Sequence, residues 1–177
     1  IVDKALKLRW ERKYPEVVAL LDSAFTLPYD YNGNGGSPDG LNHFEARRLA
    51  SQAVRQLMFA YNSSKEYESG IIHLDSLLSL PHTLVSEECR RELLVSKAQM
   101  LQGLGKYADA CLMLDSAMLL PPNDDPQSEL FVTITAGVTY RWVDSTATKA
   151  EPTLERAAEA MRHAGYDGTM LYPQAMA

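Results

Sequence analysis

One short pattern occurs three times along the chain. Each copy begins with Tyr, has Leu-Asp-Ser starting seven residues later and ends in Leu-Pro, and the copies span Tyr14–Pro28, Tyr67–Pro81 and Tyr107–Pro121. Their starts lie 53 and 40 residues apart, and the 13-residue segment Tyr29–Leu41 accounts for the difference. A repeat at fixed offsets predicts a chain built from copies of one supersecondary unit that stack on one another.

Each copy of the pattern is predicted to be a helix. In the second copy Ile71, Leu74 and Leu78 recur at three- and four-residue steps, which makes one apolar stripe. The closing prolines stand where a helix cannot continue. Amphipathic helices are also predicted before the second and third copies, at residues 43–62 and 88–104, and the joining turns are short. Each unit is therefore predicted to be an antiparallel helical hairpin.

A fourth, less regular hairpin is predicted near the end of the chain. Residues 127–143 are assigned to its first helix because the repeat requires one there, although β-branched residues such as Thr133 are poor helix formers. Residues 151–164 are predicted to form its second helix, with Pro152 near the start. The segment 144–150 is predicted to be a longer joining loop.

The composition agrees with a helical protein and excludes several function classes. Leu and Ala number 24 and 20, against 9 Val and 4 Ile, which favours helix over sheet. The formal net charge of −6 argues against non-specific binding to nucleic acid. Two cysteines, Cys89 and Cys111, exclude a disulfide-rich scaffold, and both are predicted to be buried free thiols.

The third unit resembles a tetratricopeptide repeat (TPR). Over residues 91–124 the pattern of that family falls on Leu94, Ala98, Leu101, Gly105, Tyr107, Ala110, Leu114, Ala117 and Pro122. The unit at 51–84 matches less well, because Met58 and Gly70 replace the two alanines. The resemblance implies an all-α fold in which antiparallel hairpins stack into a right-handed superhelix of about 3.5 repeats.

We therefore expect a single TPR-like domain over residues 1–177, with hairpins at about 1–28, 42–81, 87–121 and 127–165 and a loop insert at 29–41. The repeated tyrosines are expected to fill the grooves between hairpins. The repeated aspartates Asp22, Asp75 and Asp115 are expected to lie on the surface and to contact the neighbouring hairpin.

The resemblance also implies a ligand groove, because the first helix of each unit lines the inner surface of such a superhelix. The candidate groove residues are Gln52, Arg55, Phe59, Asn62, Glu92, Val95, Gln99 and Gln102, with Thr133, Tyr140 and Arg141 as looser candidates from the fourth unit. This mixed polar lining suits an extended peptide or a helix. Of the cations and amides that a carboxylate-clamp subtype would need, only Arg55 and Asn62 are present, so binding of acidic chain termini is not predicted.

The insert at 29–41 carries two further features. Tyr29 and Tyr31 stand in a polar segment outside the repeat, where tyrosines are common interface anchors. Asp30, Asn32 and Asn34 resemble the start of a calcium loop. Position 12 of that loop is Leu41 rather than the bidentate Glu that calcium requires, so no metal is predicted. No cofactor is predicted either.

These patterns predict a non-enzymatic protein or peptide interaction module. The Leu-Asp-Ser…Leu-Pro signature resembles divergent arrays in bacterial sensor kinases and helix-turn-helix regulators, which implies a regulatory or sensory segment of a larger signalling protein. A structural or self-association domain is the alternative, and an enzyme is less favoured because no catalytic motif is visible.

The expected partner is a protein or peptide, with a second copy or the flanking domains of the same chain as further options. Neither nucleic acid nor a membrane is expected to contact this segment directly. The start at Ile1 is interpreted as processing of the protein or as excision from a larger one. The segment is expected to be soluble, either in the cytoplasm or on the outer face of a membrane-anchored protein.

Overall fold

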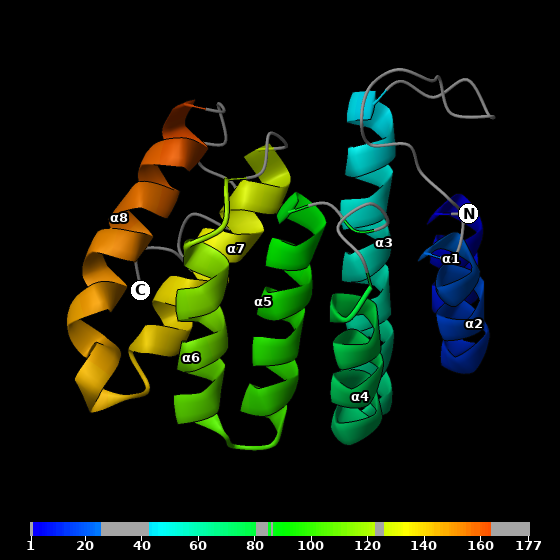
Figure 1. Ribbon diagram of the computed structural model, residues 1–177, viewed down its shortest axis with the longest axis horizontal. Helices are drawn as coiled ribbons and strands as arrows, with labels where there is room; N and C mark the ends of the chain where they lie inside the picture. Colours follow the sequence, from blue (N-terminus) through cyan, green and yellow to red (C-terminus); the bar gives the residue numbers. More distant parts are fainter. Residues whose placement is uncertain (1, 26–42, 81–84, 86, 123–125, 164–177) are drawn as a thin grey trace.

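The computed structural model describes residues 2–25, 43–80, 85, 87–122 and 126–163, and within these ranges every regular element is a helix (Figure 1). This confirms the all-α prediction. The elements are α1 (Val2–Trp10), α2 (Tyr14–Phe25), α3 (His43–Ser64), α4 (Tyr67–Leu78), α5 (Glu87–Gly103), α6 (Tyr107–Met118), α7 (Pro126–Tyr140), the short 3-10 helix η1 (Asp144–Thr146) and α8 (Ala147–His163).

Successive helices lie side by side in chain order, from α1 and α2 at one end to α8 at the other (Figure 1). Short turns join the pairs, and in the turn between α5 and α6 Gly105 has a φ of +73°. Glycine adopts this left-handed conformation without steric cost. The first helices also contact one another, since α3 packs on α5 and α5 packs on α7. The four observed pairs span Val2–Phe25, His43–Leu78, Glu87–Met118 and Pro126–His163, beside predicted hairpin ranges of about 1–28, 42–81, 87–121 and 127–165.

The Leu of each Leu-Asp-Ser motif is a core residue. Leu21, Leu74 and Leu114 are all fully buried, the first two in one hydrophobic cluster and the third in the next. Cys89 and Cys111 are buried free thiols, as predicted. The sequence pattern therefore repeats because equivalent leucines occupy equivalent core positions in successive helical hairpins.

The repeated tyrosines contact the following unit. The ring of Tyr67 lies against Gly103, where an added Cβ would come within 2.6 Å of the ring. Tyr107 stacks on Trp142, with ring centroids 5.9 Å apart and planes at 26°. In both cases the tyrosine that opens the second helix of one unit meets the end of the first helix of the next. The predicted contact between hairpins is confirmed for these two tyrosines, but Tyr107 keeps 38% of its surface exposed and is therefore not buried in a groove.

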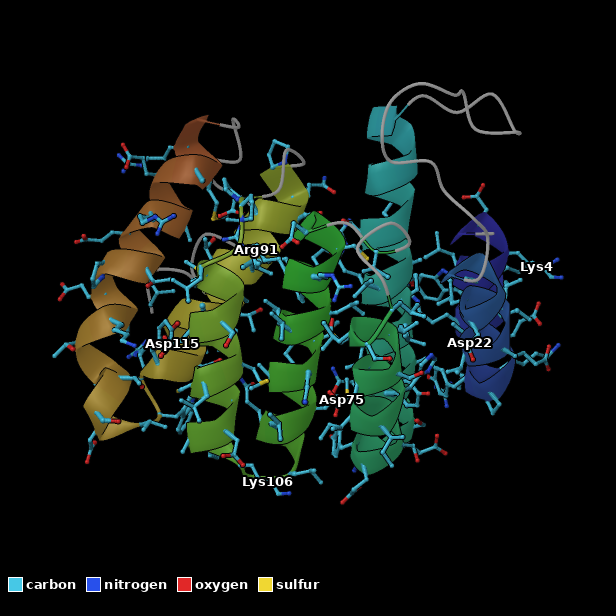
Figure 2. All side chains as sticks on the ribbon, viewed as in Figure 1. Lys4, Asp22, Asp75, Arg91, Lys106 and Asp115 are labelled. Carbon is cyan, nitrogen blue, oxygen red and sulfur yellow. The ribbon has the colours of Figure 1, made fainter. Side chains whose placement is uncertain are left out.

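The repeated aspartates also join neighbouring units, which confirms their predicted contact (Figure 2). Asp22 Oδ1 lies 2.6 Å from His73 Nε2, and His73 Nδ1 lies 2.7 Å from the hydroxyl of Tyr61. Because a carboxylate can only accept, Nε2 donates to Asp22, and in the neutral imidazole Nδ1 accepts from Tyr61. Asp75 accepts a hydrogen bond from Lys97 Nζ at 2.5 Å.

The aspartate of the third copy, Asp115, accepts hydrogen bonds from two residues of the next unit. Asp115 Oδ1 accepts a hydrogen bond from the Tyr140 hydroxyl at 2.8 Å, and Lys149 Nζ lies 2.9 and 2.8 Å from the two carboxylate oxygens. Burial raises the pKa of Asp115, but the hydrogen bonds from Lys149 and Tyr140 outweigh it and hold this pKa below its usual value. The ionised carboxylate is therefore the form that the folded protein favours.

We expect Asp115→Asn to lower the free energy of unfolding by about 1 kcal/mol at neutral pH, since the pair is largely exposed. A carboxyl with a lowered folded-state pKa stabilises the protein above its unfolded pKa of about 3.9, and this contribution is lost as pH falls through the folded value. The free energies of unfolding of the variant and the parent protein should therefore become equal in acid. Urea unfolding at neutral and acidic pH measures this, with exposed Glu155→Gln as the control. A difference that persists unchanged in acid would contradict it.

The last hairpin differs in part from the sequence prediction. Helix α8 begins at Ala147 rather than at residue 151, and η1 occupies 144–146, so the predicted joining loop is wrong over most of its length. The reason is tertiary, because Lys149 bonds Asp115 and Ala150 is buried against α6 and α7. Pro152 thus lies inside the helix rather than in its first turn.

Candidate interaction surface

The predicted groove residues lie on α3, α5 and α7 or directly after α7. Three of them, Glu92, Val95 and Tyr140, are buried, so the prediction that they line an accessible groove is wrong. Helix α5 packs against α3, α4, α6 and α7, which leaves few of its side chains in contact with solvent. Thr133 is buried as well, and its hydroxyl donates to the carbonyl oxygen of Glu129 within the same helix.

Three other predicted groove residues form hydrogen bonds with α7. Arg55 Nη1 donates to Ser128 Oγ at 2.9 Å, and Gln99 Nε2 donates to Thr135 Oγ1 at 3.3 Å. Gln102 Nε2 donates to Thr139 Oγ1. These side chains therefore connect first helices of different units to one another. Each of them uses a donor group within the fold, which disfavours a continuous open groove along α3, α5 and α7.

The remaining candidates have different surroundings. Gln52 and Asn62 are half-buried on α3, Arg141 is exposed after α7, and Phe59 keeps 42% of its surface accessible. Phe59 is thus the one predicted groove residue that presents a large apolar surface to solvent. The loop candidates Tyr29, Tyr31, Asp30, Asn32 and Asn34 lie outside the residues that the structure describes.

Phe59 belongs to a cluster that joins α1 to α3. The guanidinium carbon of Arg9 lies 4.4 Å from the centroid of the Phe59 ring and 5.7 Å from that of the Trp10 ring. Arg9 Nη1 donates to Gln56 Oε1 at 2.8 Å, which fixes the cation between α1 and α3. Trp10 itself is 80% exposed. We call Arg9, Trp10, Gln56 and Phe59 the α1–α3 surface.

Sequence reasoning found only Phe59 in this surface. The groove positions were assigned from complete repeats, and α1 belongs to a unit that matches the repeat only in its second helix. A usable signal was present, since Trp10 is one of two tryptophans in the chain and stands at the end of a helix rich in Lys and Arg. Tryptophan and arginine are the residue types most enriched at binding hot spots.

A hollow on a different part of the protein lies between α6 and α8. Asp115, Tyr140 and Lys149 form part of its lining. The Tyr140 hydroxyl and Lys149 Nζ both donate to the Asp115 carboxylate, so these polar groups already bind one another within the fold. The rest of the lining comes from Met118, Leu119, Thr148, Pro152 and Thr153. This hollow therefore offers less recognition chemistry than the α1–α3 surface.

Comparisons with known proteins return no relatives. No protein-family model matches the chain, and no curated protein or solved structure matches it. Within the described ranges, no three His, Cys, Asp or Glu side chains gather as a metal site would need. None of the described helices is both long and apolar enough to cross a bilayer.

Proposed function

We propose that this chain is a non-enzymatic protein or peptide interaction module that contacts its partner through the α1–α3 surface. The observation that carries the proposal is the exposed pair Trp10 and Phe59, whose ring centroids lie 5.7 and 4.4 Å from the Arg9 guanidinium carbon. Exposed aromatic rings lose little conformational entropy on binding and bury a large area. An arginine already fixed by Gln56 adds directional donors to that area.

We also propose a specific fold family and a biological role for the chain. The hairpins form a TPR-like right-handed superhelix, and the chain is a regulatory or sensory segment of a larger bacterial signalling protein. The repeated inter-unit contacts of Tyr67, Tyr107 and the three aspartates support the repeat architecture. The sensory role rests on the resemblance of the Leu-Asp-Ser…Leu-Pro signature alone.

The test is a selection of short peptides from a random displayed library against the immobilised protein. We expect Trp10→Ala combined with Phe59→Ala to weaken binding of the selected peptides by about thirty- to eight-hundred-fold, because each ring is worth about 1–2 kcal/mol at a binding hot spot. Both side chains are largely outside the core, so the melting temperature should change little.

The matched control replaces two exposed leucines, Leu112→Ala on α6 with Leu119→Ala directly after it, and should leave peptide affinity unchanged. Equal loss of affinity in both double variants would place the binding elsewhere and overturn the proposal. Light scattering of the protein alone tests the self-association alternative. A stable dimer that Trp10→Ala with Phe59→Ala dissociates would favour that alternative over peptide binding.

A further inference from the structure

We infer that the α1–α3 surface recognises an acidic peptide segment that carries an apolar or aromatic anchor side chain. The inference rests on the proposed function and adds the chemical class of the partner. Three features of the described residues support it. They are the positive charge of α1, the orientation of Arg9, and the packing of the apolar side chains of α1 against the protein core.

The local charge around the surface is opposite to that of the protein. Residues 2–13 hold five of the 17 basic residues, against two acids, which gives this segment a formal charge of +3 in a chain of −6. Its basic residues are Lys4, Lys7, Arg9, Arg12 and Lys13. Lys4 extends away from the other helices in Figure 2. Glu16 and Asp22 on the neighbouring α2 lower the charge of residues 2–25 to +1, so the positive charge is concentrated on α1. A basic helix on an otherwise acidic protein attracts negatively charged partners to that helix.

The Arg9 guanidinium is oriented before any partner arrives. Gln56 accepts from one of its five N–H donors, and the Phe59 ring lies 4.4 Å beneath it. The planar fork of an arginine matches a carboxylate, and fixing it in advance removes part of the entropic cost of binding. The exposed faces of Trp10 and Phe59 stand beside the cation, where an apolar side chain next to the carboxylate would pack.

The packing of α1 favours a peptide over an anionic membrane. A basic amphipathic helix that binds a bilayer inserts its apolar face into the lipid. In α1 that face is used by the fold, since Ala5 is fully buried and Leu8 packs against the same hydrophobic cluster. Trp10 is the exposed large apolar residue that remains on the helix. A single ring beside a fixed arginine suits one anchor side chain of a peptide.

The experiment uses the emission of Trp10 as a reporter within the surface. The variant Trp142→Phe leaves Trp10 as the sole tryptophan of the chain. It is titrated with a degenerate pool of short peptides built from Asp, Glu, Leu, Phe and Gly, and with a matched pool in which Asn and Gln replace the acids. We expect the acidic pool to shift the emission with an apparent affinity at least about ten-fold above that of the amide pool, and to lose this advantage at high salt.

In the same background, Arg9→Gln should remove the preference for acids, while Arg141→Gln, which changes an exposed arginine at the other end, should keep it. Equal binding of both pools at Trp10 would overturn the acidic class and leave the interaction function standing. A response of Trp10 to neither pool, together with failed library selection, would overturn both. A larger response to phosphatidylglycerol vesicles than to the acidic pool would assign the surface to a membrane and overturn the inference.

Discussion

Replacing Arg91 with methionine is expected to lower the free energy of unfolding by about 3–5 kcal/mol, the cost typical of breaking a buried ion pair. Arg91 lies on α5 with only 2% of its side chain exposed, and its guanidinium binds both carboxylate oxygens of Glu129 on α7 (Figure 2). The carbonyl oxygen of Pro121, at the end of the third repeat copy, lies 3.4 Å from Nη1. One side chain thus ties two units and the segment between them.

The physical reason for the large effect is the carboxylate left behind. Glu129 is 18% exposed and would lose the cation that compensates its desolvation. The double variant Arg91→Met with Glu129→Met leaves no unpaired charge between α5 and α7. We therefore expect the double variant to have a higher free energy of unfolding than Arg91→Met alone. Urea unfolding followed by circular dichroism measures all three. The exposed Arg156→Met serves as the control, and a loss below about 1 kcal/mol for Arg91→Met would contradict the assignment.

Truncating Leu114 to alanine is expected to cost about 2–5 kcal/mol of unfolding free energy. Leu114 is the leucine of the third Leu-Asp-Ser motif and is fully buried in the cluster with Ala98, Ala110 and Val132. Removing the isobutyl group loses its transfer free energy and leaves a cavity between close-packed helices.

A matched control lies two residues away on the same helix. Leu112 is 60% exposed, so Leu112→Ala should change the free energy of unfolding by less than about 0.5 kcal/mol. Both variants delete the same atoms from the same helix, and the difference between them isolates burial from helix propensity. Similar costs at the two positions would mean that the apolar stripe of α6 had been assigned to the wrong face.

The repeat could be predicted from the sequence because its signals are local. The apolar spacing in each copy, the closing prolines and the tyrosines reflect interactions within a helix or between adjacent helices. The contacts of Asp22, Asp75 and Asp115 could be expected for a related reason, since repetition places equivalent residues at equivalent inter-unit positions. Helix α8 began earlier than predicted because Lys149 and Ala150 are held by α6 and α7, which no local pattern records.

The binding surface could be predicted only in part. Glu92, Val95 and Tyr140 occupy positions that a resemblance to the TPR family assigns to an inner surface, yet neighbouring helices bury them. Whether such a position is open depends on how closely successive units approach. Arg55, Gln99 and Gln102 show the same effect, because each reaches α7 and bonds a hydroxyl there.

Local residue patterns are enough to predict that the chain is helical, that it contains a repeated unit and that the repeated leucines are core residues. Which side chains stay accessible, and which of them contact one another, follows only from the packing of the helices. Arg9 and Gln56 lie 47 residues apart in sequence and join only because α1 packs on α3. Periodicity along one helix fixes which face is apolar, whereas contacts between helices depend on their relative placement, which only the packed fold sets.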